Sequence, residues 1–272
     1  MALIPFPGST AARSAPDDDP EDDLQEEGAG GKMSFLEHLD ELRRRLVVSV
    51  VSVLIGFLIA FGFINQIFAF IMVPLSRILP PGGKLIYTEP TEAFMLQMKV
   101  AALAGLVLSA PIIMWQLWLF IAPGLYAKEK RFAVPFVLFS TISFVLGVAF
   151  AHYVVFPAAW AFFASYTNDY MTFMPKISDA FGLYAYMLLA FGIIFQMPVL
   201  VLALARMGLV TAGFLWRHTK YAILIIFILA AVITPSSDVV NQSIMAGPMI
   251  VLYMLSIVIA WVFGKKKRAT DE

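Results

Sequence analysis

Side chains that could do chemistry inside a membrane are almost absent from the apolar stretches of this chain. No Asp or Glu lies deep in any apolar stretch of about 20 residues, and Lys99 lies near the end of one, from where its ammonium can reach water. Because charges within a membrane usually mark ion or substrate pathways, their absence argues against a proton-coupled transporter or pump. The sequence also lacks cysteine and the GxSG and HExxH motifs of hydrolases, so we expect no catalytic residue and no cofactor.

The three histidines, His38, His152 and His218, lie far apart in the sequence and near three different apolar stretches. A metal site built from these three alone is not expected. We expect His152 to pack or to form a hydrogen bond inside the protein.

Gln196 is the uncharged polar residue of most interest, because it lies in the middle of an apolar stretch. A primary amide in hydrocarbon needs hydrogen-bond partners, which contribute about 0.6–2 kcal/mol each in a membrane. The amide could therefore bond to a neighbouring helix of the same chain, or it could receive a helix of another subunit. Pro198 leaves a backbone carbonyl without its usual donor and adds to the polar character of this region.

Two acidic residues lie in segments that flank the apolar stretches. Glu41 belongs to residues 35–46, where Phe35, Leu39, Leu42 and Leu46 share one face of an amphipathic helix. Glu129 is the only acid in the basic segment 120–131, where Pro123 and Gly124 predict a turn. A surface anchor helix and a local ion pair, worth about 0–1 kcal/mol, explain these two residues without a binding site.

The composition predicts that membrane helices position these residues. The chain is 60% hydrophobic and 14% charged, with a mean hydropathy of +0.83, whereas soluble domains are about 45–50% apolar and about 25% charged. Six apolar stretches lack the alternation of a membrane β-barrel strand, so we predict an all-α integral membrane protein with six transmembrane helices. These stretches are residues 46–64, 93–121, 132–156, 183–205, 221–233 and 244–263.

The fifth stretch is shorter than a bilayer requires. Its thirteen residues rise only about 20 Å, against a hydrocarbon core of about 30 Å. We expect the helix to extend back through Thr219 and Lys220, or the bilayer to become thinner around it.

The distribution of basic residues predicts the orientation. If the N-terminus is cytoplasmic, thirteen of the Lys and Arg in residues 33–272 lie on the cytoplasmic side, and four (Arg77, Lys84, Lys99 and Lys176) lie on the outer side. This asymmetry predicts six spans with both termini cytoplasmic. Residues 65–92 and 157–182 then form two structured outer loops, the first containing an interfacial helical piece that is interrupted at Pro74.

The two ends of the chain differ from the apolar region. Residues 1–32 carry eight acids and two bases, a sum of −6, together with four prolines, which predicts a disordered acidic tail. Residues 33–265 form the predicted six-helix domain, and residues 266–272 a short cytoplasmic tail.

Several motifs along this frame resemble the TatC family, the polytopic subunit of the twin-arginine protein translocase. The resemblance covers roughly residues 33–263, and its motifs occur in the family's order on a six-span frame. They are residues 38–46, 108–111, 120–126, 147–151, 154–157, 191–198 and 234–238, with Gln242.

The resemblance implies a function that composition alone does not indicate. Members of the family recognise signal peptides with paired arginines in the prokaryotic cytoplasmic (inner) membrane. They recruit TatA- and TatB-type subunits to move folded proteins across it, using the proton-motive force. It also implies a homo-oligomer in the receptor complex and no nucleic-acid partner. The residues that match the signal-binding motifs are Glu41, Leu42, Arg43, Phe120, Pro123, Tyr126 and Glu129, and those that match the outer-face motifs are Pro74, Asp238 and Gln242.

The implied recognition is consistent with the chemistry of the side chains. Each arginine presents a planar fork that a carboxylate can bind with two hydrogen bonds, so Glu41 and Glu129 could read two adjacent arginines. The sequence departs from the family at Gln196, where many members carry Glu, so this position keeps its hydrogen bonds but cannot ionise. A small-solute secondary transporter remains the alternative, because its composition and topology would be the same.

Overall fold

The structure is a computed structural model of the chain, and it describes all residues except 1–34, 79–84, 126–132, 171–172, 235–237 and 265–272. The chain divides into two compact units, residues 1–42 and residues 43–272. The predicted acidic tail and the short C-terminal tail lie outside the described residues.

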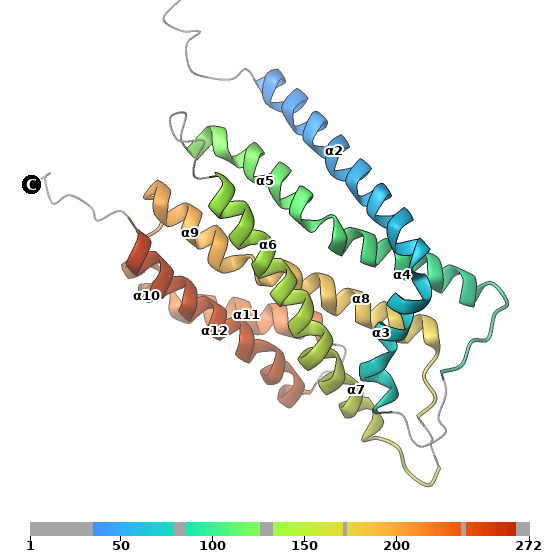
Figure 1. The fold of residues 1–272 in the computed structure, drawn as a ribbon. Coiled ribbons are helices and arrows are strands. Elements are labelled where there is room, and N and C mark those ends of the chain that lie inside the picture. The colour runs from blue at the N-terminus through green and yellow to red at the C-terminus, as the bar shows by residue number, and fades with distance from the viewer. Residues whose placement is uncertain (1–34, 79–84, 126–132, 171–172, 235–237, 265–272) are drawn as a thin grey trace, which may run out of the picture. The chain divides into compact units, whose positions relative to one another are not determined.

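The described residues are almost entirely helical (Figure 1), which confirms the predicted all-α class. The elements are α2 (Phe35–Gly62), α3 (Ile64–Ser76), α4 (Glu92–Leu108), α5 (Ala110–Leu125), α6 (Ala133–Phe150), the π-helical turn η2 (Ala151–Val155), α7 (Phe156–Ala164), α8 (Ile177–Ile194), α9 (Met197–Met207), α10 (Ala212–Arg217), α11 (Thr219–Ile233) and α12 (Val239–Phe263).

Four helical segments of the described chain are long and apolar enough to cross a membrane. They are Glu37–Gly62, Val134–Ala164, Ile177–Met207 and Val239–Phe263, and a bent pair formed by α4 and α5 brings the number to five. α11 begins at Thr219, as predicted, but its 15 residues are shorter than the other spans.

Large apolar side chains cover the outside of these helices. Leu58, Val232 and Trp261 have 68%, 67% and 77% of their surface exposed. Exposed apolar surface on this scale is unfavourable in water but is the normal outer surface of a membrane protein, because lipid tails are as apolar as these side chains.

Proline residues break two of the predicted spans. The predicted stretch 93–121 is two helices, α4 and α5, which meet at Ser109 with a bend of 52°. Pro111 is the second residue of α5 and has no N–H to donate to the preceding turn, which accounts for the bend. Pro198 is likewise the second residue of α9 and follows the break after α8.

The outer segments contain more helix than the sequence predicted. α3 continues through Pro74 to Ser76, so the expected interruption at Pro74 is wrong. This proline lies in the last turn of the helix, where losing one backbone hydrogen bond leaves the rest of the helix intact. Residues 157–182 are also not mainly loop, because α7 extends to Ala164 and α8 begins at Ile177.

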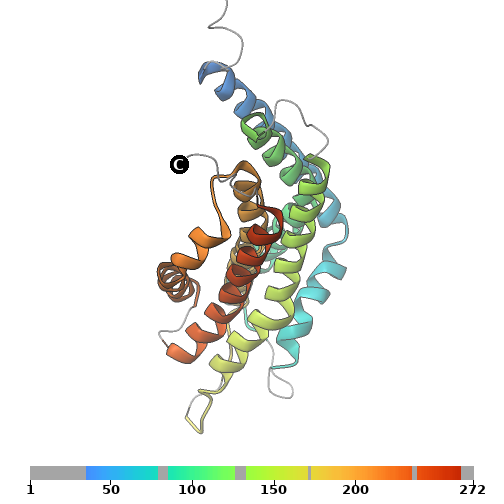
Figure 2. The ribbon, with the colours of Figure 1, turned by 90° about the vertical axis from the view of Figure 1, so that its left-hand side faces the viewer.

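In the second unit, α6 runs antiparallel to α5 and α8, and α12 runs antiparallel to α11 but in the same direction as α9. α6 packs against α5 and α8, and α12 packs against α9 and α11 (Figure 1). Figure 2 shows α11 almost end-on at one edge of this unit, beside α12. The largest buried cluster lies around Phe156, Tyr184, Met187 and Phe191, and a smaller one surrounds Trp118.

His152 lies inside this packing, as predicted. Its side chain is 2% exposed, and its Nδ1 shares a hydrogen bond of 3.0 Å with the hydroxyl of Tyr184 on α8. The ring of Phe70 from α3 stacks on the imidazole, with the ring centres 4.4 Å apart. The π-helical turn η2 therefore carries a histidine that joins α3 and α8 to the third predicted span.

Candidate functional site

The N-terminal part of the predicted signal-binding site lies on α2. Glu41 is half-buried and Leu42 is exposed, and both belong to the first unit. Arg43 is exposed and begins the second unit. The three consecutive residues are helical, so their side chains point in different directions around the axis of α2.

The second part of the predicted site lies on the last turns of α5. Phe120 is half-buried, and Trp118 beside it is 3% exposed and packs on Phe136 of α6 with ring centres 4.9 Å apart. α5 continues to Leu125, so the turn expected at Pro123 and Gly124 is helical instead. Tyr126 and Glu129 lie outside the described residues.

These residues therefore remain predictions as a binding site. Within the second unit, the structure places Phe120 one helical turn before Pro123, since the two are three residues apart on α5. α5 and α9 end, and α6 begins, at the same end of the helices in Figures 1 and 2. No group of three or more His, Asp or Glu residues in the described part of the chain could hold a metal ion.

The amide of Gln196 is bonded within the protein. Ser140 on α6 donates from its hydroxyl to Gln196 Oε1 at 2.5 Å, and Gln196 Nε2 donates to the backbone carbonyl of Ser140 at 3.0 Å. The hydroxyl of Ser140 also lies 3.3 Å from Met114 Sδ on α5. This arrangement supports the simpler of the two interpretations, a contact that holds α5 and α6 to the break between α8 and α9. Pro198 is buried beside it.

Two of the three predicted outer-face residues form hydrogen bonds in the first turn of α12. Asp238 caps α12, because its Oδ2 accepts a hydrogen bond from the backbone N–H of Asn241 at 3.1 Å. Gln242 Nε2 donates to the backbone carbonyl of Phe227 on α11 at 2.8 Å. Pro74 is buried in α3. Asp238 therefore holds the start of α12, and Gln242 joins α12 to α11.

The two predicted outer segments meet at one end of the second unit. The N–H of Ile86 donates to the carbonyl of Pro175 at 3.3 Å, and the N–H of Ile177 donates to the carbonyl of Ile86 at 2.9 Å. These bonds form a short parallel bridge between Ile86 and Lys176. We call this end, formed by residues 85–92 and 173–178, the bridged end.

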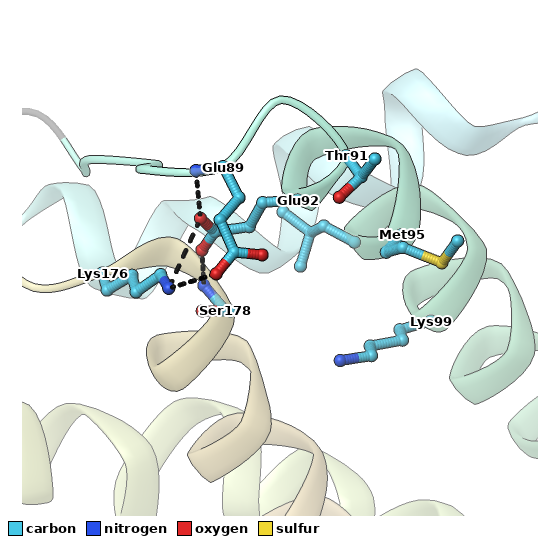
Figure 3. Close-up of a pocket in the computed structure, with 8 residues that line it drawn as sticks. Glu89, Thr91, Glu92, Met95, Lys99, Lys176 and Ser178 are labelled. Atoms are coloured by element: carbon cyan, nitrogen blue, oxygen red, sulfur yellow. Dashed lines mark hydrogen bonds and ion pairs between the residues drawn. The ribbon is translucent and has the colours of Figure 1, made fainter.

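A buried carboxylate, which the sequence analysis missed, supports the bridged end (Figure 3). Glu92, at 8% exposure, accepts hydrogen bonds from the backbone N–H groups of Thr88 at 3.0 Å and Ser178 at 3.3 Å. Its Oε2 also lies 3.8 Å from Lys176 Nζ, and Glu89 lies 3.9 Å from the same ammonium. The signal in the sequence is an acid directly before the predicted stretch 93–121, at a helix start where a negative charge is favourable.

Comparisons with known proteins identify the family. The family described as Sec-independent protein translocase protein (TatC) matches residues 37–248. A protein of Desulforapulum autotrophicum named Sec-independent protein translocase protein TatC is 44% identical over 241 residues, which is 89% of each chain. A protein of the same name from Koribacter versatilis is 42% identical over 248 residues, 90% of this chain and 91% of the relative.

The fold agrees with these relatives. The chain is similar to a crystal structure described as the twin-arginine translocase receptor TatC, with a TM-score of 0.71 and 36% identity over 82% of this chain and 98% of that chain. A second crystal structure of such a receptor, in the detergent DDM, gives a TM-score of 0.74 over 85% of this chain and 100% of that chain. With matching family motifs, similar relatives along most of its length and the same fold, this chain belongs to the TatC family of Sec-independent protein translocase proteins.

Proposed function

We propose that this subunit of the twin-arginine translocase is the receptor for signal peptides with paired arginines and the scaffold for its partner subunits. The observation that carries the proposal is the similarity to solved structures described as twin-arginine translocase receptors, which extends over more than four fifths of the chain. Transport of folded proteins then needs no catalytic residue in this subunit. Its work is to bind the signal peptide and to recruit partners.

The proposed peptide site combines charge with an apolar support. Glu41 and Glu129 each bind one arginine of the pair, since each guanidinium can donate two parallel hydrogen bonds to one carboxylate. Leu42, Arg43, Phe120, Pro123 and Tyr126 complete the motif around these acids. The buried Trp118 supports this role, because its packing on Phe136 ties α5 to α6 two residues before Phe120.

The proposed topology has six spans with both termini in the cytoplasm of a prokaryotic cell. In it α11 is the fifth span, although its 15 residues rise only about 22 Å. Local thinning of the bilayer would accommodate this short helix. Two observations support the topology. Basic residues are in excess on the side of the membrane that would hold the N-terminus, and both predicted outer segments meet at the bridged end.

We also propose that Gln196 and Pro198 receive the helix of a TatA- or TatB-type partner. The contacts with Ser140 set a condition on this docking, because a partner must share or replace hydrogen bonds that the amide already makes. Pro74, Asp238 and Gln242 form the proposed outer-face motif, in which Asp238 and Gln242 hold the start of α12. Several copies of the subunit then assemble into one receptor complex in the lipid bilayer.

The decisive experiment compares two signal peptides that differ only in the paired residues. The full-length protein in membranes is photo-crosslinked to a peptide with Arg-Arg and to a matched peptide with Lys-Lys. Lys carries the same charge but lacks the planar fork, so we expect much stronger labelling by the Arg-Arg peptide. Equal labelling by both peptides would rule out the proposed receptor role.

A further inference from the structure

A cavity of about 210 Å³ opens at the bridged end, between the first turns of α4 and the start of α8 (Figure 3). Its wall includes two lysines, Lys99 from α4 and Lys176 from the segment before α8. Thr91 lines the cavity with a hydroxyl, and Met95 and Leu96 line it with apolar side chains. Neither the peptide site nor the docking site proposed above uses this cavity.

The buried acid of this cavity, Glu92, already has hydrogen-bond donors and a cation that balance its charge. Glu92 accepts backbone hydrogen bonds from Thr88, Glu89 and Ser178, and Lys176 lies within ion-pair distance of it. A carboxylate with this many donors needs no further cation. Glu89, the other acid of the wall, has a side chain that is 70% exposed and is solvated at the rim.

The two ammonium groups, in contrast, keep unused hydrogen-bond donors. Lys176 Nζ lies 3.8 and 3.9 Å from its two carboxylates, which is beyond hydrogen-bond distance. Lys99 is exposed, and no ion pair joins it to any other residue that the structure describes. One cavity is therefore lined by two cations, and only one of them has acidic neighbours within 4 Å.

The depth of Lys99 indicates the kind of anion that would balance it. This residue lies seven positions after Glu92, about 10 Å along the axis of an apolar helix that belongs to the bent span. A charged side chain at such a depth extends toward the membrane interface, where phospholipid phosphates lie. Met95 and Leu96 then offer apolar contacts to the part of the lipid that adjoins its headgroup.

We propose that this cavity binds the phosphate group of a phospholipid at the outer surface of the membrane. Lys99 and Lys176 are its two cationic contacts, and the hydroxyl of Thr91 donates a hydrogen bond to a phosphate oxygen. Lipid bound there covers the junction of α4 and α8 and neutralises Lys99. A phospholipid and free inorganic phosphate both offer a phosphate group to this cavity, but only the phospholipid has acyl chains.

Native mass spectrometry of the full-length protein, released from membranes and supplied with phosphatidylglycerol, tests the proposal. Removal of one charge-assisted contact in Lys99→Gln should lower retention of this lipid about tenfold. Lys99→Arg should restore it, because the charge remains. The matched control is Arg77→Gln, which removes an exposed base after α3 that does not line the cavity and should retain lipid as the native protein does.

Two further arms identify the ligand. Diacylglycerol, which has acyl chains but no phosphate, should show no difference between the native protein and Lys99→Gln. Millimolar inorganic phosphate should not displace phosphatidylglycerol. Unchanged lipid retention in Lys99→Gln would overturn the proposal, as would displacement by inorganic phosphate. Lys99 is exposed, so thermal unfolding of its variants should match that of the native protein, which shows that the loss of lipid does not come from misfolding.

Discussion

Gln196 and Ser140 bond to each other twice, through the serine hydroxyl and the serine carbonyl, across the interface between α6 and the break after α8. Both polar atoms of the amide are thereby used inside the subunit. Position 196 is a neutral contact between helices, so any docking at this position must act through hydrogen bonds.

The two roles of Gln196 can be separated with a pair of variants. Ser140→Ala removes the hydroxyl donor but leaves the amide in place, whereas Gln196→Leu removes the amide itself. If the amide receives a partner helix, Gln196→Leu should reduce co-purification of TatA- and TatB-type subunits, while Ser140→Ala should leave it unchanged. Binding of the signal peptide should be similar in both variants. If the two variants recover the partner subunits equally well, Gln196 has no role in docking and serves only as a contact between helices of this chain.

The crossing of α2 and α4 predicts a strong effect of a single methyl group. A Cβ on Gly56 would lie 2.5 Å from the carbonyl oxygen of Gly105, and one on Gly105 would lie 2.5 Å from the backbone nitrogen of Phe57. Because backbone cannot move aside as a side chain can, Gly56→Ala and Gly105→Ala should each destabilise the protein by about 1–3 kcal/mol. Thermal unfolding in detergent measures this.

Gly62→Ala is the matched control for these variants. Gly62 ends the same helix, and a Cβ there would meet nothing within 4 Å. This change should leave the melting temperature unchanged or raise it slightly, because Ala favours the helix over Gly by up to about 1 kcal/mol. A similar loss of stability in all three variants would show that the close crossing is not the cause.

Glu92 should hold the two outer segments together. Glu92→Gln keeps the size of the side chain but removes the charge that faces Lys176 and one of the two carboxylate acceptors. The backbone N–H of Ile177, which donates to Ile86, should then exchange with deuterium several times faster. Glu89→Gln, at an exposed position beside the same lysine, should have little effect. If the N–H of Ile177 exchanges slowly in both variants, the backbone hydrogen bonds hold the bridge without help from Glu92.

The proposed peptide site predicts different effects for two acids on α2. Glu41→Ala should weaken binding of an Arg-Arg signal peptide about tenfold or more, since it removes one carboxylate of a charge-assisted pair. Glu37→Ala, one helical turn earlier on an exposed position, should bind as the native protein does. Glu129→Ala should resemble Glu41→Ala. Fluorescence anisotropy with a labelled peptide measures all three, and an unchanged affinity in Glu41→Ala would contradict its role.

The sequence by itself determined the fold class, the family and most helix positions. Helix periodicity and the length of an apolar stretch are local properties of the sequence. The amphipathic segment 35–46 accordingly continues into the first span as one helix, α2, and α11 begins at Thr219 as expected. The family motifs are also local strings of residues, and the comparisons confirm the family that they indicate.

Only the tertiary structure decided how polar side chains are satisfied. The bonds of Gln196 to Ser140, and of Glu92 to Ser178, join residues 56 and 86 positions apart, and no periodicity in the sequence indicates such pairs. The bend at Ser109 and the passage of α3 through Pro74 show the same limit, because every proline lacks a backbone N–H. Its position in the helix and the packing around it decide whether the chain bends, and both depend on neighbours that are distant in sequence.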